Sequence, residues 1–194
     1  MDNKLKIKEF LKNNSGYIST SDFLKLNISK PLIKKYLDSG LIRKVAHGLY
    51  MDSDLLEDEY YIIQRKYSNV IFSHYTALYL LDFLYIEPTK IDISIERNKR
   101  VNGDYNVHYT SDRYFDIGIT KVKTRYSNTV KTYNVERCIC DILRNESENN
   151  IELQNIVLDN YFISKEKNIK RLLEYSKIFN IYEKVNTLVE YAIR

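Results

Sequence analysis

The sequence of 194 residues has no tryptophan, two prolines, five glycines and two cysteines. So little proline and glycine excludes polyproline segments and long flexible linkers. No apolar run is long enough to span a bilayer, and residues 1–14 lack an apolar signal core. We therefore expect a soluble, cytoplasmic protein without a membrane partner. The composition, with 44% hydrophobic and 29% charged residues, is that of a globular protein of one or two domains.

Cysteine and histidine do not form any recognisable reactive or metal-binding pattern. Cys138 and Cys140 are two positions apart, which makes a poor disulfide and does not indicate a secreted framework. His47, His74 and His108 are far apart in the sequence and lack metal-ligand spacing. Neither a phosphate-binding glycine loop nor a nucleophile elbow is present. We predict no metal, no cofactor, no catalytic residue and no enzymatic activity.

A nuclease-like grouping of charged residues is the one catalytic alternative. Asp92, Glu96, Arg97 and Lys99 occur near a predicted strand end, where nucleases often place carboxylates and a lysine. The usual nuclease spacing is an acid followed by Glu-x-Lys, whereas two residues separate Glu96 from Lys99 here. The spacing favours a solvated cluster over the active site of a DNA-processing enzyme.

Positive charge is concentrated at the N-terminal end of the chain. Residues 1–50 hold ten basic and four acidic residues, a net charge of +6, whereas the remaining residues hold 20 basic and 22 acidic ones. Such an asymmetry indicates a polyanionic partner for the N-terminal part, or else a lysine-rich solvated face.

The first forty residues predict three helices. Apolar residues recur at helical spacing over residues 4–12, residues 17–18 form a short strand, and Thr20 or Ser21 caps a second helix. Ser29 caps a third helix, which Gly40 ends as the C′ residue. The buried face of this third helix is predicted to comprise Leu32, Ile33, Tyr36 and Leu37.

A hairpin follows the third helix and completes a winged helix-turn-helix. Residues 41–45 and 49–51 read as strands on either side of Ala46-His47-Gly48. A basic helix face would enter the major groove while the wing contacts phosphates. The candidate DNA-binding residues are Ser29, Lys30, Lys34, Lys35, Arg43, Lys44 and His47. The alternative is a winged helix that docks a protein.

The rest of the chain predicts a mixed α/β domain that ends in a helical block. Helices are predicted at 54–67, 75–81, 135–144, 151–162, 169–179 and 182–193, the second of them capped by Ser73. Strands are predicted at 90–96, 105–109, 118–125 and 129–133. Asn102-Gly103 predicts a tight turn. In residues 90–96 the alternation predicts a half-buried strand. The fold class is therefore α+β, with a winged helix-turn-helix domain at 1–53 and an α+β domain at 54–194.

A second group of basic residues lies in this later part. Its members are Arg97, Lys99, Arg100, Lys121, Lys123 and Arg125. The last three alternate, so they are expected on one strand face, where a charged outer surface that protects a sheet edge is the favoured interpretation. For residues 97–100, a charged outer surface and a second contact surface for DNA or a partner are equally good interpretations.

Three blocks of sequence resemble the AbiEi antitoxin family. The first comprises Gly16–Phe23 and Ser29–Tyr50, which match the family's entry to helix two and its Gly-Leu-Ile wing pattern. The second is Ile71–Leu81, with a Ser-x-x-Thr-Ala-Leu pattern, and the third is Tyr133–Arg144, with a Glu-Arg-x-x-x-Asp-x-Leu-Arg pattern. The blocks occur in the family's order over residues ~5 to ~145.

This resemblance implies the antitoxin of an AbiE abortive-infection system, a type IV toxin–antitoxin pair that confers phage resistance. It implies a transcriptional repressor that regulates its own operon negatively by binding inverted repeats, and antagonism of a co-encoded nucleotidyltransferase toxin without a stable complex. The alternative is a plain winged-helix regulator whose second domain senses a ligand or mediates interactions. Because no long apolar heptad seam is present, we expect a monomer that assembles cooperatively on DNA.

Overall fold

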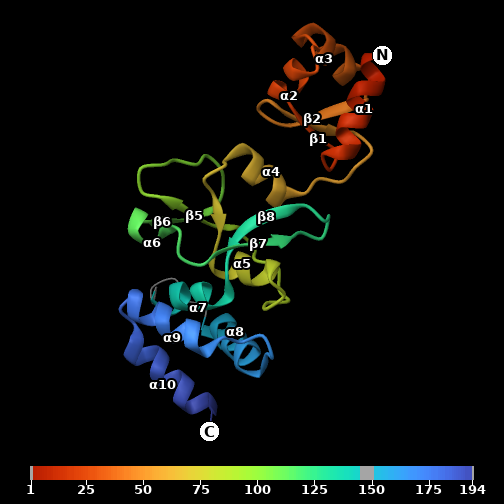
Figure 1. Cartoon of the computed structure of the whole chain (residues 1–194). Helices are drawn as coiled ribbons and strands as arrows, with labels where there is room; N and C mark the ends of the chain where they lie inside the picture. The colour runs from red at the N-terminus through yellow and green to blue at the C-terminus, as the bar shows by residue number, and fades with distance from the viewer. Residues whose placement is uncertain (1, 145–150, 194) are drawn as a thin grey trace. The chain divides into compact units, whose positions relative to one another are not determined.

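A computed structural model describes residues 2–144 and 151–193 (Figure 1). The chain forms two compact units. The N-terminal unit runs to Ser68 and also includes Thr124–Asn128, and the C-terminal unit comprises the other described residues. Within the described ranges, every helix is too short or too polar to cross a bilayer.

The N-terminal unit has the predicted order of helix, turn, helix and wing. Its sheet has the strand order β1-β3-β2, and both strand pairs are antiparallel. The elements are α1 (Asn3–Asn13), β1 (Tyr17–Ser19), α2 (Thr20–Lys25), α3 (Lys30–Asp38), β2 (Ile42–Ala46), β3 (Leu49–Asp52) and α4 (Glu59–Lys66).

A small apolar core holds the three helices and the wing together. On α3, Ile33 and Tyr36 are buried, and Leu32 and Leu37 pack at the edge of the core, as the spacing predicts. The fully or nearly buried members of this core are Ile7, Leu11, Ile18, Phe23, Ile28, Ile33, Tyr36 and Ile42.

The cap of α2 differs from the prediction. Ser19, not Thr20 or Ser21, is the N-cap, and with Asp22 it forms a capping box. Asp22 lies three residues after Ser19, which is the spacing at which a side chain reaches back to the N-cap N–H. At the end of α3, Gly40 has a φ of +72°, the left-handed conformation expected of a C′ residue.

Helix α4 extends the N-terminal unit past residue 53. The predicted helix at 54–67 begins only at Glu59, because the buried Asp58 is its N-cap and accepts a hydrogen bond from the N–H of Tyr61 at 3.2 Å. Tyr61 also packs on Tyr17, with ring centroids 4.9 Å apart. The expected boundary between 53 and 54 therefore lies inside this compact unit.

A turn from far along the chain completes the same unit. The side-chain nitrogen of Asn128 donates to Oδ2 of Asp58 at 2.8 Å, and the hydroxyl of Thr124 donates to the same oxygen. The N–H of Asp58 donates to the Tyr17 hydroxyl at 3.1 Å. Asp58 thus joins three segments: its N–H bonds to β1, and its carboxylate bonds to α4 and to the 124–128 turn.

The C-terminal unit confirms the mixed α+β class. Its five strands have the order β6-β5-β4-β8-β7, in which β4–β5 and β7–β8 are antiparallel while β4–β8 and β5–β6 are parallel. The elements are β4 (Ile71–Phe72), α5 (His74–Leu80), β5 (Asp92–Glu96), β6 (Asn106–Thr110), α6 (Asp112–Phe115), β7 (Ile119–Lys123), β8 (Thr129–Tyr133), α7 (Val135–Arg144), α8 (Ile151–Ile163), α9 (Ile169–Ile178) and α10 (Tyr182–Ile193).

Several details of this unit differ from the predictions. Strands β5 and β6 are parallel, so the Asn102-Gly103 turn does not join a hairpin. Asp92 and Ser94 are buried, as are Ile93 and Ile95, so β5 is covered on both faces. Strand β4 and helix α6 are too short to produce a periodic signal and were not predicted.

Helix α7 is buried throughout most of its length and carries the Glu-Arg-x-x-x-Asp pattern. The fully buried Arg137 donates from Nε to Asp141 at 2.8 Å and from Nη1 to the Tyr114 carbonyl at 2.6 Å. Glu136 accepts a hydrogen bond from the Tyr161 hydroxyl at 3.3 Å. These hydrogen bonds fix α7 against its neighbours, while the second oxygen of Asp141, Oδ1, is buried without a hydrogen-bond partner among the described residues. The cysteines of the helix are free and buried.

Candidate DNA-binding groove

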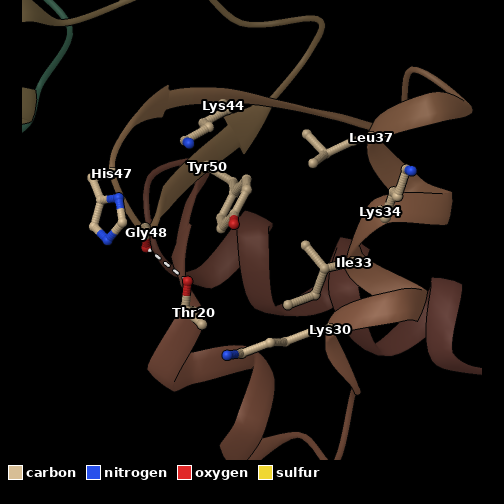
Figure 2. A pocket seen from close by; sticks show the side chains of 9 residues that line it. All are labelled: Thr20, Lys30, Ile33, Lys34, Leu37, Lys44, His47, Gly48 and Tyr50. Atoms are coloured by element: carbon tan, nitrogen blue, oxygen red, sulfur yellow. Dashed lines mark hydrogen bonds between the residues drawn. The ribbon is translucent and has the colours of Figure 1, made fainter.

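A hollow of about 320 Å³ lies between α3 and the wing of the N-terminal unit (Figure 2). Figure 2 shows Tyr50 at its centre, Lys44 and His47 on the wing side, and Lys30 on the α3 side. The lining residues are Thr20, Lys30, Ile33, Lys34, Leu37, Lys44, His47, Gly48 and Tyr50. The groove therefore brings together α3, both wing strands and the start of α2.

The basic side chains of the groove come from two local periodicities. Lys30 and Lys34 are four residues apart on α3, so they lie on one face, next to the buried Ile33 that also lines the groove and away from the buried Tyr36. Lys44 lies opposite Tyr50 in the antiparallel wing, and both residues line the groove. The nine lining residues contribute three lysines and one histidine and no carboxylate. The surface is therefore suited to a polyanion.

The tip of the wing is fixed to α2 by its backbone. The carbonyl of Gly48 accepts hydrogen bonds from the N–H of Thr20 at 2.9 Å and from its hydroxyl at 3.4 Å, the latter drawn in Figure 2. Gly48 has a φ of +68°, a left-handed conformation that suits glycine. This attachment sets the width of the groove, because it holds the wing near the start of α2.

Arg43, although predicted as a wing contact, does not line the groove. It pairs with Met51 in the strand register, whereas its neighbour Lys44 pairs with Tyr50. Neighbouring residues of a strand point to opposite faces, and Arg43 instead forms an ion pair with Glu57 and donates to the carbonyl of Leu55 at 3.0 Å. Its guanidinium is thus committed to the segment that leads into α4.

Two other predicted DNA contacts, Ser29 and Lys35, also lie outside the groove lining. Ser29 is exposed as the N-cap of α3 but its side chain makes no capping hydrogen bond. Lys35 is exposed and does not line the groove. Thr20 and Tyr50 were missed by the sequence reasoning. Regular pairing from a two-residue wing turn would place Val45 opposite Tyr50; a shift of register between Lys44 and Ala46 places Lys44 there instead, and no sequence signal indicated it.

The second basic group is dispersed. Arg97, Lys99 and Arg100 follow β5, and Arg100 donates to the carbonyl of Lys99 at 3.0 Å. Lys121 and Lys123 are exposed on one face of β7, as alternation predicts.

Arg125 does not continue that row. Strand β7 ends at Lys123, and Arg125 lies in the 124–128 turn, which belongs to the N-terminal unit. Its guanidinium lies 5.0 Å from the Tyr126 ring centroid. The expected common face of Lys121, Lys123 and Arg125 is thus limited to its first two members.

Two histidines that are far apart in the sequence meet in the C-terminal unit. The rings of His74 and His108 stack with centroids 3.6 Å apart. Among residues 2–144 and 151–193, no three His, Cys, Asp or Glu side chains are arranged to hold a metal ion.

Asp92 and Glu96 lie at opposite ends of β5, which separates two members of the nuclease-like grouping.

Three helices, an antiparallel hairpin and a basic groove between the last helix and the hairpin define a winged helix-turn-helix protein. Residues 6–51 match the family model described as "Transcriptional regulator, AbiEi antitoxin". The resemblance to the AbiEi antitoxin family is therefore confirmed over this segment, which contains every residue that lines the groove.

A solved structure shares the fold over nearly the whole chain. The crystal structure of the RV2827C protein from Mycobacterium tuberculosis is 11% identical, with a TM-score of 0.64 over 96% of this chain and 75% of that chain. At this identity the likeness concerns the fold alone. No curated protein matches the sequence.

Proposed function

We propose that this protein is the antitoxin and transcriptional autorepressor of a type IV toxin–antitoxin system of the abortive-infection kind. The observation that carries the proposal is the groove between α3 and the wing, which Lys30, Lys34 and Lys44 line without any carboxylate beside them. It lies within the segment that matches the AbiEi transcriptional regulators. An α-helix fits the major groove of B-DNA, and a neighbouring wing is then close to the phosphates.

In this proposal α3 reads the operator and the wing fixes its register. Lys30 and Lys34 face the bases or the adjacent phosphates, while Lys44 and His47 contact the backbone. Lysine recognises guanine O6 and N7 as a mobile point charge, without the fork of arginine. One copy therefore discriminates weakly, and specificity requires two copies on an inverted repeat.

The second activity is assigned to the C-terminal unit, which contains the two later blocks of the family resemblance, Ile71–Leu81 and Tyr133–Arg144. This unit would antagonise a co-encoded nucleotidyltransferase toxin in the cytoplasm without forming a stable complex. A plain regulator would bind the same DNA but give no protection from a toxin.

DNA binding is tested with the full-length protein and the DNA upstream of its own gene. We expect Lys34→Ala combined with Lys44→Ala to abolish the preference for this DNA at moderate salt. The matched control is Lys165→Ala combined with Lys170→Ala, two exposed lysines of the C-terminal unit. Equal binding by both double variants would contradict the assignment of the groove.

Assembly and toxin antagonism are tested separately. Sedimentation of the free protein at micromolar concentration is expected to show a monomer, with two copies bound cooperatively on an inverted repeat. Expression of a neighbouring nucleotidyltransferase gene alone is expected to arrest growth, and co-expression of this protein is expected to restore it. Continued growth arrest, together with intact operator binding, would favour the plain regulator.

A further inference from the structure

The C-terminal unit contains a polar hollow of about 280 Å³ that has no role in the proposed DNA contacts. It lies where the start of α5, strand β6 and the end of α7 meet. Val107 supplies aliphatic surface, and the other lining residues have polar side chains: His74, His108, Tyr109, Thr110, Asp141 and Arg144. Its volume is near the lower limit for small-molecule sites, and its lining is suited to a compact polar ligand.

One wall of the hollow is held rigidly by the stacked histidines. Nε2 of His108 lies 3.0 Å from Oδ1 of Asp92, which also accepts a hydrogen bond from the Asn106 side chain at 3.2 Å. His74 has a φ of +48°, a conformation that is strained for a residue other than glycine and that is found preferentially at functional sites. Burial, and then the neighbouring His108, lower the pKa of His74 well below its ordinary value, so its ring is neutral.

The end of α7 brings a buried acceptor and a cation to the same hollow. Oδ2 of Asp141 accepts from Nε of Arg137 at 2.8 Å. Its other oxygen, Oδ1, is buried and has no hydrogen-bond partner within residues 2–144 and 151–193. The guanidinium of Arg144 lies 3.6 Å from this oxygen, and the Arg144 side chain is 43% exposed. An unsatisfied buried carboxylate oxygen that lines a hollow indicates a ligand that donates a hydrogen bond.

The hydrogen-bond donors of Arg144 and Thr110 outnumber the single acceptor without a partner, Oδ1 of Asp141, and this restricts the class of ligand. Arg144 and Thr110 bring N–H and O–H donors, whereas Oδ1 of Asp141 needs a single donor from the ligand. A hydrogenphosphate group has several acceptor oxygens and one hydroxyl. A zwitterionic amino acid would instead bring three ammonium hydrogens to one acceptor. Burial raises the pKa of Asp141 although Arg137 opposes this, which makes the carboxylate a better acceptor for a shared proton.

We propose that this hollow binds a phosphate that keeps a hydroxyl: inorganic phosphate, or a small phosphomonoester in its monoprotonated form. For a phosphomonoester this is the minor form above its second pKa of about 6. Arg144 and Thr110 donate to the anionic oxygens, and the phosphate hydroxyl donates to Oδ1 of Asp141. The site thereby distinguishes phosphate from sulfate, because sulfate carries no proton at neutral pH. The proposal stands apart from DNA recognition, since it concerns different residues in the other compact unit.

The test uses the full-length protein titrated with inorganic phosphate, glycerol phosphate or sulfate. The readouts are calorimetry and the imidazole NMR signals of the three histidines. We expect phosphate to shift the His74 and His108 signals and to bind at least tenfold more tightly than sulfate. His47, which lines the DNA-binding groove, serves as an internal control for anions bound there. Stronger binding of glycerol phosphate would identify a phosphorylated metabolite as the source, and weaker binding would identify free phosphate.

Two variants locate the site. Arg144→Gln removes a charged donor and is expected to weaken phosphate binding about tenfold or more, whereas the control Arg113→Gln, at an exposed position, leaves it unchanged. Asp141→Asn replaces the acceptor with a donor and is expected to reduce or reverse the preference over sulfate. Equal affinities for phosphate and sulfate in the unaltered protein, or unchanged binding in Arg144→Gln, would overturn the proposal even if Asp141→Asn failed to fold.

Discussion

Arg43 of the wing forms an ion pair with Glu57, in the segment that leads into α4. The same guanidinium donates to the carbonyl of Leu55 at 3.0 Å. Lys44, the next residue, lines the groove instead. Two neighbouring basic residues of the wing thus have different surroundings: Arg43 is paired within the protein, and Lys44 lines the groove.

This division predicts different salt dependences for two alanine variants. Each neutralised phosphate contributes about −0.9 to the slope of log affinity against log salt. Lys44→Ala is expected to reduce the magnitude of that slope by about 1. Arg43→Ala is expected to leave the slope nearly unchanged and to cost at most about 1 kcal/mol of stability, as exposed ion pairs do. Titrations of the operator between 50 and 200 mM salt measure both slopes; an equal decrease in the two variants would place Arg43 at the DNA.

Lys34 provides a test of base reading by α3. If Lys34 contacts a base, Lys34→Ala is expected to cost ~1–3 kcal/mol on the operator and much less on random DNA. Lys35→Ala is the matched control, because Lys35 is exposed on the same helix but does not line the groove. Competition binding against random DNA measures the two losses. Equal losses on both DNAs would make Lys34 a phosphate contact.

The cap of α2 predicts acid sensitivity of the N-terminal unit. Burial raises the pKa of Asp22, but hydrogen bonds from the Ser19 hydroxyl and N–H, with the charges of Lys25 and Arg65, outweigh burial and hold it below its ordinary value of 3.8. A carboxyl whose pKa is lowered by folding stabilises the folded state above its unfolded pKa, and this contribution is lost as the pH falls through the folded pKa. The stability due to Asp22 is therefore present at neutral pH and lost below about pH 4.

Asp22→Ala removes both this charge and the capping box. We expect a loss of about 0.5–2 kcal/mol at pH 7, which becomes smaller below about pH 4 because the unaltered protein then loses the same interactions. Urea denaturation at pH 7 and pH 3 measures the difference. A loss that is the same at both pH values would show that the charge of Asp22 contributes nothing.

The extent of the N-terminal unit predicts the behaviour of fragments. A fragment of residues 1–68 retains the packing of Tyr61 and Ile62 on Tyr17, Leu49 and Met51, which a fragment of residues 1–53 lacks. The longer fragment is expected to melt at a higher temperature. Thermal unfolding followed by circular dichroism compares the two, and equal midpoints would show that α4 does not contribute to the stability of the winged helix.

Local periodicity accounts for what the sequence predicted. The i, i+4 spacing of Lys30 and Lys34 places both on one face of α3. The two-residue turn at His47-Gly48 pairs Ala46 with Leu49, but Lys44 lies opposite Tyr50 only because the strand register shifts between Lys44 and Ala46, which the alternation does not encode. The same rule of alternation implies that Arg43 and Lys44 face opposite ways, so their grouping as joint wing contacts conflicted with a pattern already present in the sequence.

Contacts between distant segments account for what the sequence did not reveal. His74 and His108 stack because β5 pairs with β6 in a parallel register and α5 follows β4, and no short-range pattern encodes that arrangement. The parallel pairing also means that the Asn102-Gly103 segment lies within the connection between two parallel strands, whereas such a turn commonly joins an antiparallel hairpin.

The hydrogen bonds of Asp58 have a consequence for the newly synthesised protein. This carboxylate is separated from Thr124 by 66 positions, so it cannot reach its final partners until the ribosome has added them. At about 5–20 residues per second the delay is several seconds. During that time α3 and the wing have already been synthesised, whereas the Asp58 carboxylate still lacks the two side chains that donate hydrogen bonds to it.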